Sequence, residues 1–251
     1  LHSGIDRTVE VNGLEAGRTL AARFVSEIPS GKGVNVARSL GELGVEASLL
    51  GLVGEDRATE FAASFAATPI ACRLTAVPIR TRVNTTIIDP ESGAVTHLRE
   101  SSSPMAETDF RTLRRRLLGD LAGVEWVVFS GSVPPGVAAE AFAGLVAAAR
   151  DCRASVAVDS SGPALACAVA TGIDLIKPNR EELEELMARP VRTGEEIVDA
   201  GKELVARHPR LEVLASDGEQ GAWLITRDGA WHARAARPQA VRKAVGAGDA
   251  L

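Results

Sequence analysis

The sequence predicts an α/β fold, with a mostly parallel central sheet flanked by helices and a small β-sheet appendage. Two observations predict it. From about residue 120 onward, short continuous apolar runs alternate with amphipathic helical stretches, a pattern typical of a parallel sheet covered on both faces. Two other stretches, 7–25 and 78–100, are rich in Thr, Val and Ile and carry Pro and Gly turn signals, which favour antiparallel strands.

In the alternating part, each apolar run has the length of a buried strand and each stretch between has helical periodicity. The predicted strands are 124–131, 154–162, 173–179 and 211–218, and the predicted helices are 137–150, 180–188 and 195–208. Nearer the N-terminus, apolar residues at helical spacing predict a helix over 33–44, closed by Gly44. The run that follows predicts a strand over 47–54.

The two stretches rich in Thr, Val and Ile form the appendage. The second contains "DPESG", a turn signal that predicts a hairpin at that point. Because these stretches interrupt the alternation of strands and helices, we expect a discontinuous lid on the α/β core, over about 7–25 and 78–100.

Composition narrows the class of protein. The 251 residues suit one large domain or a core with a small appendage. A formal net charge of −5 argues against a general nucleic-acid binder, and no apolar run approaches the ~18 residues of a membrane span. Cys72, Cys152 and Cys167 lack metal-type spacing, so we expect reduced, buried thiols. Because the chain opens without a signal segment, we expect a cytoplasmic enzyme that binds neither nucleic acid nor membranes.

The stretch "VGAGD" near the end of the chain suits phosphoryl transfer. At a helix N-terminus, the backbone N–H groups of Gly246, Ala247 and Gly248 would bind an anion. Asp249 would lie in the first turn, where the helix dipole keeps a carboxylate ionised. Such a carboxylate can take the proton of an attacking hydroxyl while the amides hold the charge of the transferring group. The alternative is a capped helix without chemistry.

The motif "SGKGVNVAR" offers polar groups at the start of another helix. Gly31 permits close backbone approach, Lys32 supplies a positive charge, and Asn35 can hydrogen-bond hydroxyl groups. A phosphate or sugar would find all three groups useful. The alternative is a solvated loop that carries a lysine.

The motif "KPNREE" falls where α/β folds bind ligands. Pro178 ends a predicted strand, which puts Lys177 and Asn179 at the carboxyl edge of the sheet. Glu182, three residues after Asn179, shares its helix face, and the pair could organise a metal–phosphate complex through water. The alternative is a polar helix start with an N-cap asparagine.

Further polar groups are predicted at the same edge and in the lid. "SGSVPPG" and "VDSSG" each follow a predicted strand and open onto the carboxyl edge. "TRVN" places Arg82 and Asn84 in the second lid stretch, from which a lid could reach a substrate.

These motifs occur in the order found in one family. "DRTVEV", "SGKGVNVARSLGELG", "TRVN", "SGSVPPG", "VDSSG", "IKPNREEL" and "VGAGD" resemble the motifs of the ribokinase-like PfkB carbohydrate kinases, over essentially the whole chain. They look most like the branch that phosphorylates ketohexose phosphates, the 1-phosphofructokinases and tagatose-6-phosphate kinases. The resemblance implies a Rossmann-like core with a β-sheet lid, magnesium-ATP as phosphoryl donor, and homodimers joined through the lids. It leaves a role for a monovalent cation open.

The resemblance also implies roles for individual residues. Asp249 would be the catalytic base, and the anion hole would be Gly246, Ala247 and Gly248. The sugar phosphate would be bound by Asp6, Gly31, Lys32, Asn35 and Arg82. The nucleotide phosphates would be bound by Lys177, Asn179 and Glu182, the last two also holding Mg²⁺ through water, and the nucleotide-site turn would contain Ser216 and Gly218.

Three positions depart from the family's usual motifs. Ser30 stands where a glycine is usual, Ala244 where a threonine is usual, and Asp217 where an apolar residue is usual. These changes bear on substrate and nucleotide preference rather than on the reaction. Because family members continue beyond the aspartate, we expect this kinase domain, 1–251, to be C-terminally incomplete, with a further helix and part of the adenine pocket in the functional protein.

The sequence therefore predicts ATP-dependent phosphorylation of a ketohexose phosphate, with fructose 1-phosphate preferred and fructose 1,6-bisphosphate as product. Tagatose 6-phosphate and fructose 6-phosphate are alternative acceptors. An alternative of another class is a catalytically weak sugar- or nucleotide-binding protein that keeps the fold.

Overall fold

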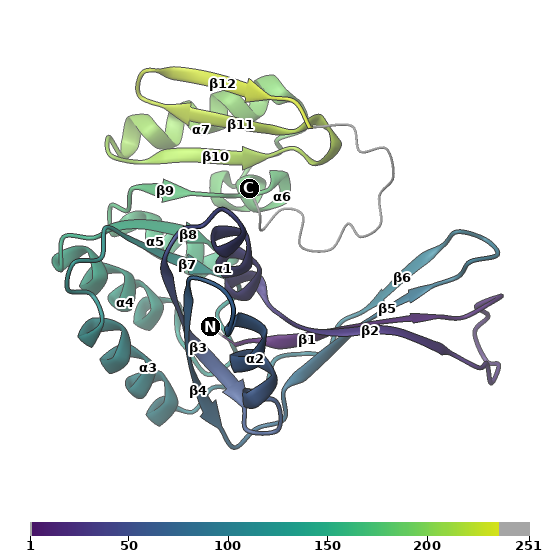
Figure 1. The fold of residues 1–251 in the computed structure, drawn as a ribbon. Helices are drawn as coiled ribbons and strands as arrows, with labels where there is room; N and C mark the ends of the chain where they lie inside the picture. The colour runs from purple at the N-terminus through teal and green to yellow at the C-terminus, as the bar shows by residue number, and fades with distance from the viewer. Residues whose placement is uncertain (1, 236–251) are drawn as a thin grey trace. The chain divides into compact units, whose positions relative to one another are not determined.

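In the computed structural model, which describes residues 2–235, the chain divides into a first unit, Leu1–Met105, and a second unit, Ala106–Leu251. Each unit has its own strands and helices (Figure 1). The predicted base Asp249 and the predicted anion hole at Gly246, Ala247 and Gly248 lie outside the described residues.

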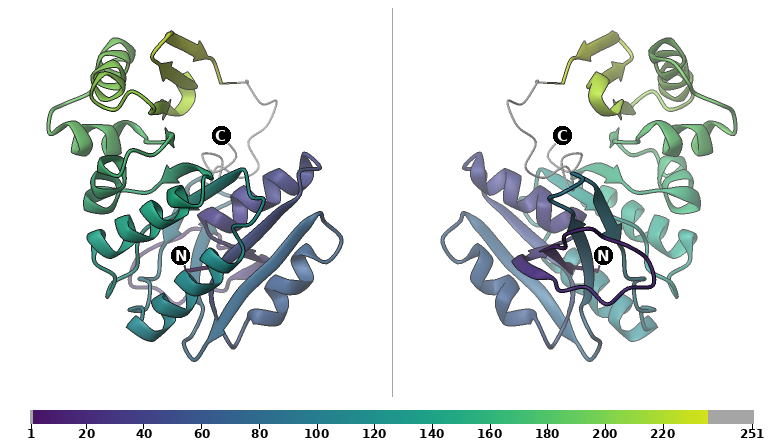
Figure 2. Two further views of the ribbon diagram at one scale, coloured as in Figure 1. Left: turned by 90° about the vertical axis from the view of Figure 1, so that its left-hand side faces the viewer. Right: turned by 90° about the vertical axis from the view of Figure 1, so that its right-hand side faces the viewer.

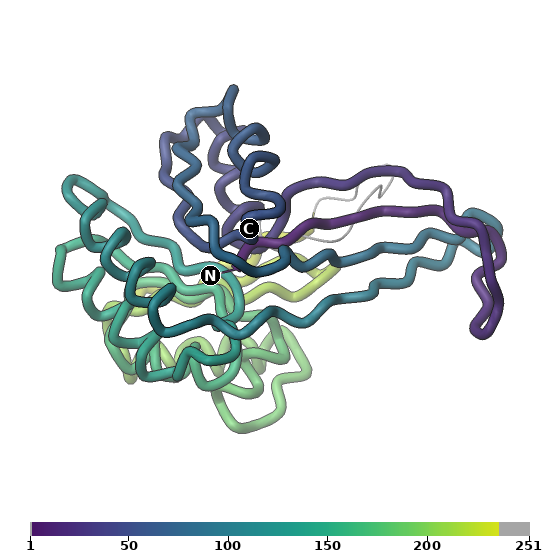
Figure 3. Tube along the Cα trace, turned by 90° about the horizontal axis from the view of Figure 1, so that it is seen from below, coloured from purple at the N-terminus to yellow at the C-terminus, as the bar shows by residue number. Residues whose placement is uncertain are grey.

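Four strands form the lid sheet of the first unit, side by side in the order β2-β1-β5-β6 (Figures 1 and 3). They are β1 (Gly4–Glu10), β2 (Arg23–Ser30), β5 (Arg82–Ile88) and β6 (Val95–Leu98). The hairpins β1–β2 and β5–β6 are antiparallel, but β1 and β5 pair in parallel. The prediction of antiparallel strands is therefore wrong for the central pair, because both hairpins enter the sheet from the same end.

The two hairpins are tied together at their far ends by Asp89. Residues 11–22, which were predicted as part of a strand stretch, connect β1 to β2 there. The Asp89 carboxylate accepts hydrogen bonds from the Ser92 hydroxyl at 2.8 Å and from the backbone N–H groups of Gly13 and Leu14 at 3.2 and 3.3 Å. These bonds, Ser92 first, hold the pKa of Asp89 below its ordinary value. One carboxylate thus connects both loops.

An apolar core anchors the base of the lid. Helices α1 (Lys32–Glu42) and α2 (Ala58–Phe65) pack on the parallel strands β3 (Ala47–Gly54) and β4 (Ile70–Val77). Ile5 of β1 and Val83 of β5 are buried in the same cluster as Phe61. Burial of such side chains stabilises the fold by roughly 1.5–3 kcal/mol each, so the first residues of both lid strands are fixed. The predicted helix over 33–44 and strand over 47–54 are confirmed.

An ion-pair network joins the lid to α2 within this unit. Glu27 of β2 accepts from Arg7 Nε at 2.8 Å and lies 2.8 Å from the Nη2 atom of Arg57, just before α2. The hydrogen bond from Arg7, followed by the charges of Arg7 and Arg57, outweighs the effect of burial and lowers the pKa of Glu27. Glu27 therefore connects the lid to the residue that precedes α2.

Within residues 106–235, six strands form the sheet of the second unit, in the order β12-β11-β10-β9-β8-β7. They are β7 (Trp126–Ser130), β8 (Ser155–Asp159), β9 (Leu175–Ile176), β10 (Glu212–Ser216), β11 (Ala222–Thr226) and β12 (Gly229–Ala233). Strands β7 to β10 are parallel, and β11 and β12 are antiparallel to their neighbours. The predicted mostly parallel sheet is confirmed, with shorter strands than predicted.

The described helices of this unit lie in a row on one side of the strands (Figure 2). They are α3 (Glu107–Gly119), α4 (Ala139–Asp151), α5 (Gly162–Ala170), α6 (Arg180–Met187) and α7 (Gly194–Arg207). Because β7 to β10 follow one another in the sheet, each right-handed crossover passes over the same face. The predicted sheet flanked by helices is confirmed, and the described helices of this unit lie on one of its faces.

Two predictions from composition can be compared with the described residues. No helix among residues 2–235 combines the length and the apolarity that a bilayer span requires. The three cysteines are free thiols, as predicted, but the prediction that they are buried is wrong: Cys152 is exposed just after α4, and Cys72 and Cys167 are only partly buried.

A partly buried ion pair joins two segments of the second unit. Arg180, the first residue of α6, pairs with Asp217, which follows β10, and also donates to the backbone oxygen of Arg192. The Asp217 side chain is 7% exposed and that of Arg180 is 37% exposed. A carboxylate this buried is stable only when it is paired. The departure at Asp217 noted in the sequence is thus matched by a cation on the neighbouring helix.

We predict that Arg180 and Asp217 are energetically coupled. In a double-mutant cycle with Arg180→Ala and Asp217→Ala, chemical denaturation should give a coupling of roughly 1–3 kcal/mol, because each single change leaves a partly buried charge without its partner. The matched control is Arg18 with Glu15, an ion pair whose side chains are both 64% exposed, where the coupling should be near zero. Equal coupling for the two pairs would contradict this prediction.

Candidate active site

The base of the lid holds a buried carboxylate with two polar neighbours. Asp6 of β1 is 7% exposed. Its Oδ2 accepts from the Ser30 hydroxyl at 2.8 Å and its Oδ1 from Asn84 Nδ2 at 3.3 Å. Strand register brings these side chains together, because Asn84 of β5 lies beside Asp6 on the same face of the sheet. Ser30, at the end of β2, lies two residues beyond the register partner of Asp6 and so on that same face. The lid thus presents a fixed hydrogen-bond acceptor that suits sugar hydroxyls.

Ser30 leads directly into the predicted glycine loop. Gly31 has φ 127°, in the region that favours glycine, and a Cβ there would lie 3.4 Å from Ser3 Cα. Lys32 begins α1 one residue later, and the Asn35 side chain, in its first turn, accepts from Arg38 at 3.2 Å. The structure therefore gathers Asp6, Gly31, Lys32 and Asn35 at the junction of the lid and α1.

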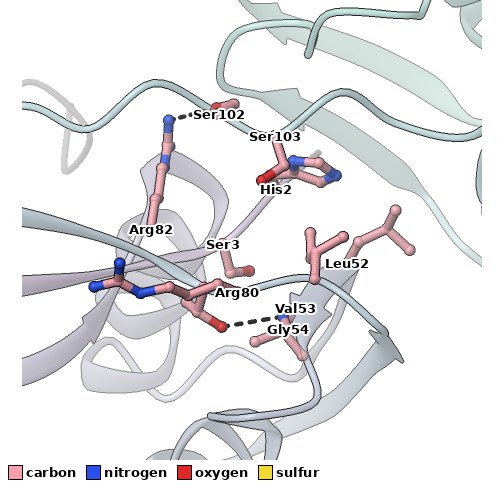
Figure 4. Close-up of a pocket in the computed structure, with 11 residues that line it drawn as sticks. His2, Ser3, Leu52, Val53, Gly54, Arg80, Arg82, Ser102 and Ser103 are labelled. Carbon is pink, nitrogen blue, oxygen red and sulfur yellow. Dashed lines mark hydrogen bonds between the residues drawn. The ribbon is translucent and has the colours of Figure 1, made fainter.

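Arg82 lies next to this group at the start of β5. It pairs in register with Gly4, two residues from Asp6, and its Nη1 donates to Ser102 Oγ at 2.8 Å. A hollow between the starts of β1 and β5, the end of β3 and the Ser102–Ser103 segment adjoins the arginine (Figure 4). All the predicted sugar-phosphate residues thus lie in the first unit.

The predicted nucleotide-phosphate residues lie in the second unit, at the carboxyl ends of its strands. Lys177 follows β9, and its Nζ lies 3.4 Å from Asp159 Oδ2 at the end of β8. Both side chains are largely buried, with exposed fractions of 15% and 5%. The hydroxyls of Ser130 and Ser160, which end or follow the neighbouring strands, are buried without a hydrogen-bond partner among the described residues. Such groups are ready to bind a ligand or water.

Asn179 and Glu182 form a reciprocal capping box at the start of α6. Asn179 Oδ1 accepts from the Glu182 backbone N–H at 2.8 Å, and Glu182 Oε2 accepts from the Asn179 N–H at 2.9 Å. The structural alternative, an N-cap asparagine, is therefore realised. This cap is compatible with a magnesium site, because both side chains carry oxygen atoms that could bind the ion through water. Mg²⁺ keeps several waters when it binds near phosphates.

The described residues of this site offer few direct protein ligands for a metal ion. No cluster of three or more His, Cys, Asp or Glu residues within 2–235 is arranged to hold a metal ion. A magnesium ion near Asn179 and Glu182 would thus need water and phosphate oxygens as its other ligands.

The remaining nucleotide-site residues lie beside this cap. Ser216 ends β10 and forms an isolated bridge with Asn179, and its backbone N–H donates to the Pro178 oxygen at 2.9 Å. Gly218 has φ 54° in the turn that follows and accepts from Gly221 N at 3.1 Å. The second unit thus brings Lys177, Asn179, Glu182, Ser216 and Gly218 to one edge of its sheet.

Three residues of these groups were not assigned a role from the sequence. Ser30 stands where the family usually has a glycine, and its hydroxyl donates a hydrogen bond to Asp6. Asp159 lies in the motif "VDSSG", and the signal for its role is an acidic residue at the end of one strand and a lysine just after the next. Ser102 had no local signal, because its contact with Arg82 spans 20 residues of chain.

The chain is similar to known carbohydrate kinases over its whole length. The family model described as "pfkB family carbohydrate kinase" matches residues 3–251. The 1-phosphofructokinase of Rhodobacter capsulatus is 38% identical over 100% of this chain and 79% of that protein, and that of Haemophilus influenzae is 30% identical over 100% and 80%.

Solved structures show the same likeness. Phosphofructokinase-2 from Escherichia coli is 28% identical and covers 100% of this chain, whether in complex with fructose-6-phosphate (TM-score 0.89, 82% of that chain), in its tetrameric inhibited form (0.89, 82%) or in complex with potassium (0.90, 81%). The fold, the order of the motifs and these matches agree, and the chain belongs to the pfkB family of carbohydrate kinases, with its ribokinase-like α/β fold.

Proposed function

We propose that this protein is an ATP-dependent kinase of a ketohexose phosphate, with fructose 1-phosphate as preferred acceptor and fructose 1,6-bisphosphate as product. The observation that carries the proposal is the buried Asp6 carboxylate beside Arg82 on one face of the lid sheet. A carboxylate accepts hydrogen bonds from sugar hydroxyls, and a guanidinium binds phosphate. One face of the lid sheet thus carries a group that suits the hydroxyls of a sugar phosphate and a group that suits its phosphate.

The relatives support the choice of acceptor. Proteins named 1-phosphofructokinase match the whole chain, which favours fructose 1-phosphate. The structure of phosphofructokinase-2 with fructose-6-phosphate keeps fructose 6-phosphate as an alternative acceptor, beside tagatose 6-phosphate. In each case Lys32 would supply a second cation for the acceptor's phosphate, and Gly31 and Asn35 would contact its hydroxyls.

The phosphoryl transfer would use the predicted base, the predicted anion hole and the nucleotide-phosphate residues. Asp249 would take the proton of the acceptor hydroxyl, and the amides of Gly246, Ala247 and Gly248 would stabilise the charge on the phosphoryl group. Lys177, held by Asp159, would bind the donor's phosphates, and Ser216 and Gly218 would line the nucleotide site. Asn179 and Glu182 would hold Mg²⁺ through water, which neutralises phosphate charge when bound.

The assembly and the ions are further parts of the proposal. We propose a homodimer joined through the lids, and the potassium complex of phosphofructokinase-2 supports a monovalent-cation site. Phosphofructokinase-2 from Escherichia coli also has a tetrameric inhibited form. The cytoplasmic location stays a prediction.

The first test is a substrate panel with magnesium-ATP. Fructose 1-phosphate should give the highest kcat/KM, with tagatose 6-phosphate and fructose 6-phosphate lower. Free fructose, ribose and nucleosides should fall below it by about 100-fold or more, because they lack the charge-assisted hydrogen bonds to phosphate. Phosphorus NMR of the product identifies the hydroxyl that was phosphorylated. Turnover only of unphosphorylated acceptors would overturn the proposal, and calorimetric binding without turnover would favour the sugar-binding alternative.

The dimer is tested by sedimentation velocity at micromolar concentration. The lid's edge strands expose apolar side chains, with Phe24 60% and Leu98 55% exposed. The wild type should sediment as a dimer, and a variant with Phe24→Asp and Leu98→Asp should shift toward the monomer. Leu43→Asp is the matched control, because Leu43 is 78% exposed but lies at the end of α1, outside the lid. A monomeric wild type, or equal disruption by Leu43→Asp, would contradict a lid interface.

A further inference from the structure

One nitrogen of the Arg82 guanidinium has a hydrogen-bond partner, and another is buried without one among the described residues. Its Nη1 donates to Ser102 Oγ at 2.8 Å. Its Nε is buried and has no hydrogen-bond partner within the described part of the chain. Burial lowers the pKa of Arg82, with Asp6 opposing and Arg99 adding to the effect, although an arginine stays charged at neutral pH. A desolvated cation with an unused donor is stabilised when an anion binds.

Gly4 and Ser102 determine the position of the Arg82 side chain. Gly4 lies beside Arg82 in the parallel register, and a Cβ at Gly4 would be 2.9 Å from Arg82 Cγ and 3.3 Å from its backbone oxygen. The stem of Arg82 therefore crosses the sheet where no side chain stands in its way. Beyond it, Ser102 fixes the guanidinium from the segment that follows β6.

The hollow beside the arginine is lined with hydroxyl groups. Ser3, Thr81, Ser102 and Ser103 line it together with Arg82 (Figure 4). The Thr81 hydroxyl is already engaged, because it donates to Asp56 and accepts from the Gly54 N–H. Ser102 and Ser103 are the hydroxyls on the returning segment, and Figure 4 shows both near the top of the hollow.

The spacing along the sheet suits one acceptor molecule. Asp6 pairs with Asn84 and Gly4 with Arg82, so the carboxylate and the guanidinium stand two residues apart along parallel strands. Two residues of a strand span about 7 Å. A ketohexose whose hydroxyls bind at Asp6 would therefore bring its phosphate to Arg82 and the hollow.

We propose that Ser102 is a specificity-determining residue: it aims the Arg82 guanidinium into this hollow and, with Ser103, donates hydroxyl hydrogen bonds to the acceptor's phosphate group. This inference rests on the proposed function, which supplies a phosphorylated acceptor. It adds that selection for the phosphate depends on the segment after β6, through a serine that contacts the arginine rather than through cations alone.

The serine run 101–103 provides its own control. Ser102→Ala should raise the KM for fructose 1-phosphate about tenfold, because a charged group loses a hydrogen-bond partner, and should leave the KM for ATP unchanged. Ser101→Ala also removes a serine hydroxyl, but Ser101 is exposed and does not line the hollow, so both KM values should match those of the wild type. Ser102→Thr keeps the hydroxyl and should recover most of the affinity. Free fructose should bind Ser102→Ala and the wild type equally, which separates a phosphate contact from a general structural defect.

A second variant approaches the arginine from its other side. Gly4→Ala should displace the Arg82 stem and raise the same KM, which tests the path of the arginine independently of Ser102. Titration calorimetry with fructose 1-phosphate gives the same comparison without turnover.

The reference variant Arg82→Met separates the two proposals. If Arg82→Met raises the KM for fructose 1-phosphate and Ser102→Ala changes it less than twofold, the role of Ser102 is wrong while the phosphate site stands. If Arg82→Met itself leaves that KM unchanged, the placement of the phosphate under the proposed function is wrong. A rise for Ser101→Ala equal to that for Ser102→Ala would also overturn the inference.

Discussion

The first unit depends on one electrostatic constraint, the burial of the Asp6 carboxylate. A carboxylate removed from water is costly unless hydrogen bonds replace its hydration. Ser30 and Asn84 supply two of those bonds from the strands on either side of β1. The arrangement requires β1 to lie between β2 and β5, in the register observed. That register also fixes Gly31 and α1 directly after Ser30, and Arg82 beside Gly4.

In the second unit, the order of the strands brings the predicted nucleotide-phosphate residues together. Because β7 to β10 are consecutive and parallel, their carboxyl ends meet at one edge and the residues that follow each strand become neighbours. Lys177 is held there by Asp159, and α6 begins there with the Asn179 and Glu182 cap. The ion pair of Arg180 and Asp217 joins that helix start to the turn after β10. Residues far apart in sequence thus form one cluster of polar groups.

Local patterns in the sequence were enough for much of this fold. Apolar periodicity placed α1, α4, α6 and α7 to within a few residues, and apolar runs placed β3, β7, β8 and β10. The lid strands were less well predicted, because Thr- and Val-rich stretches do not reveal which part is strand and which part is the 11–22 connection. The parallel pairing of β1 with β5 joins segments 78 residues apart, and no local signal records such a register.

For the site, the sequence identified residue types that suit the chemistry but not their partners. Side chains such as Ser30, Asp159 and Ser102 act through contacts across 18 to 24 residues of chain, which only the folded sheet reveals. Asp217 illustrates the same limit, because the sequence alone does not explain a charged residue at this position. The structure explains it by the ion pair with Arg180. The predicted base and anion hole, Asp249 with Gly246, Ala247 and Gly248, rest on sequence alone.

The most direct measurement of the central claim is the kinetics of Asp6→Asn. An amide of the same size keeps the contacts of the lid base but loses the charge that binds sugar hydroxyls. We predict that kcat/KM for fructose 1-phosphate falls about 100-fold, because two charge-assisted hydrogen bonds weaken, while the KM for ATP and the melting temperature change little. A kcat/KM within twofold of the wild type, in a protein confirmed to be folded, would contradict the claim that the base of the lid binds the acceptor.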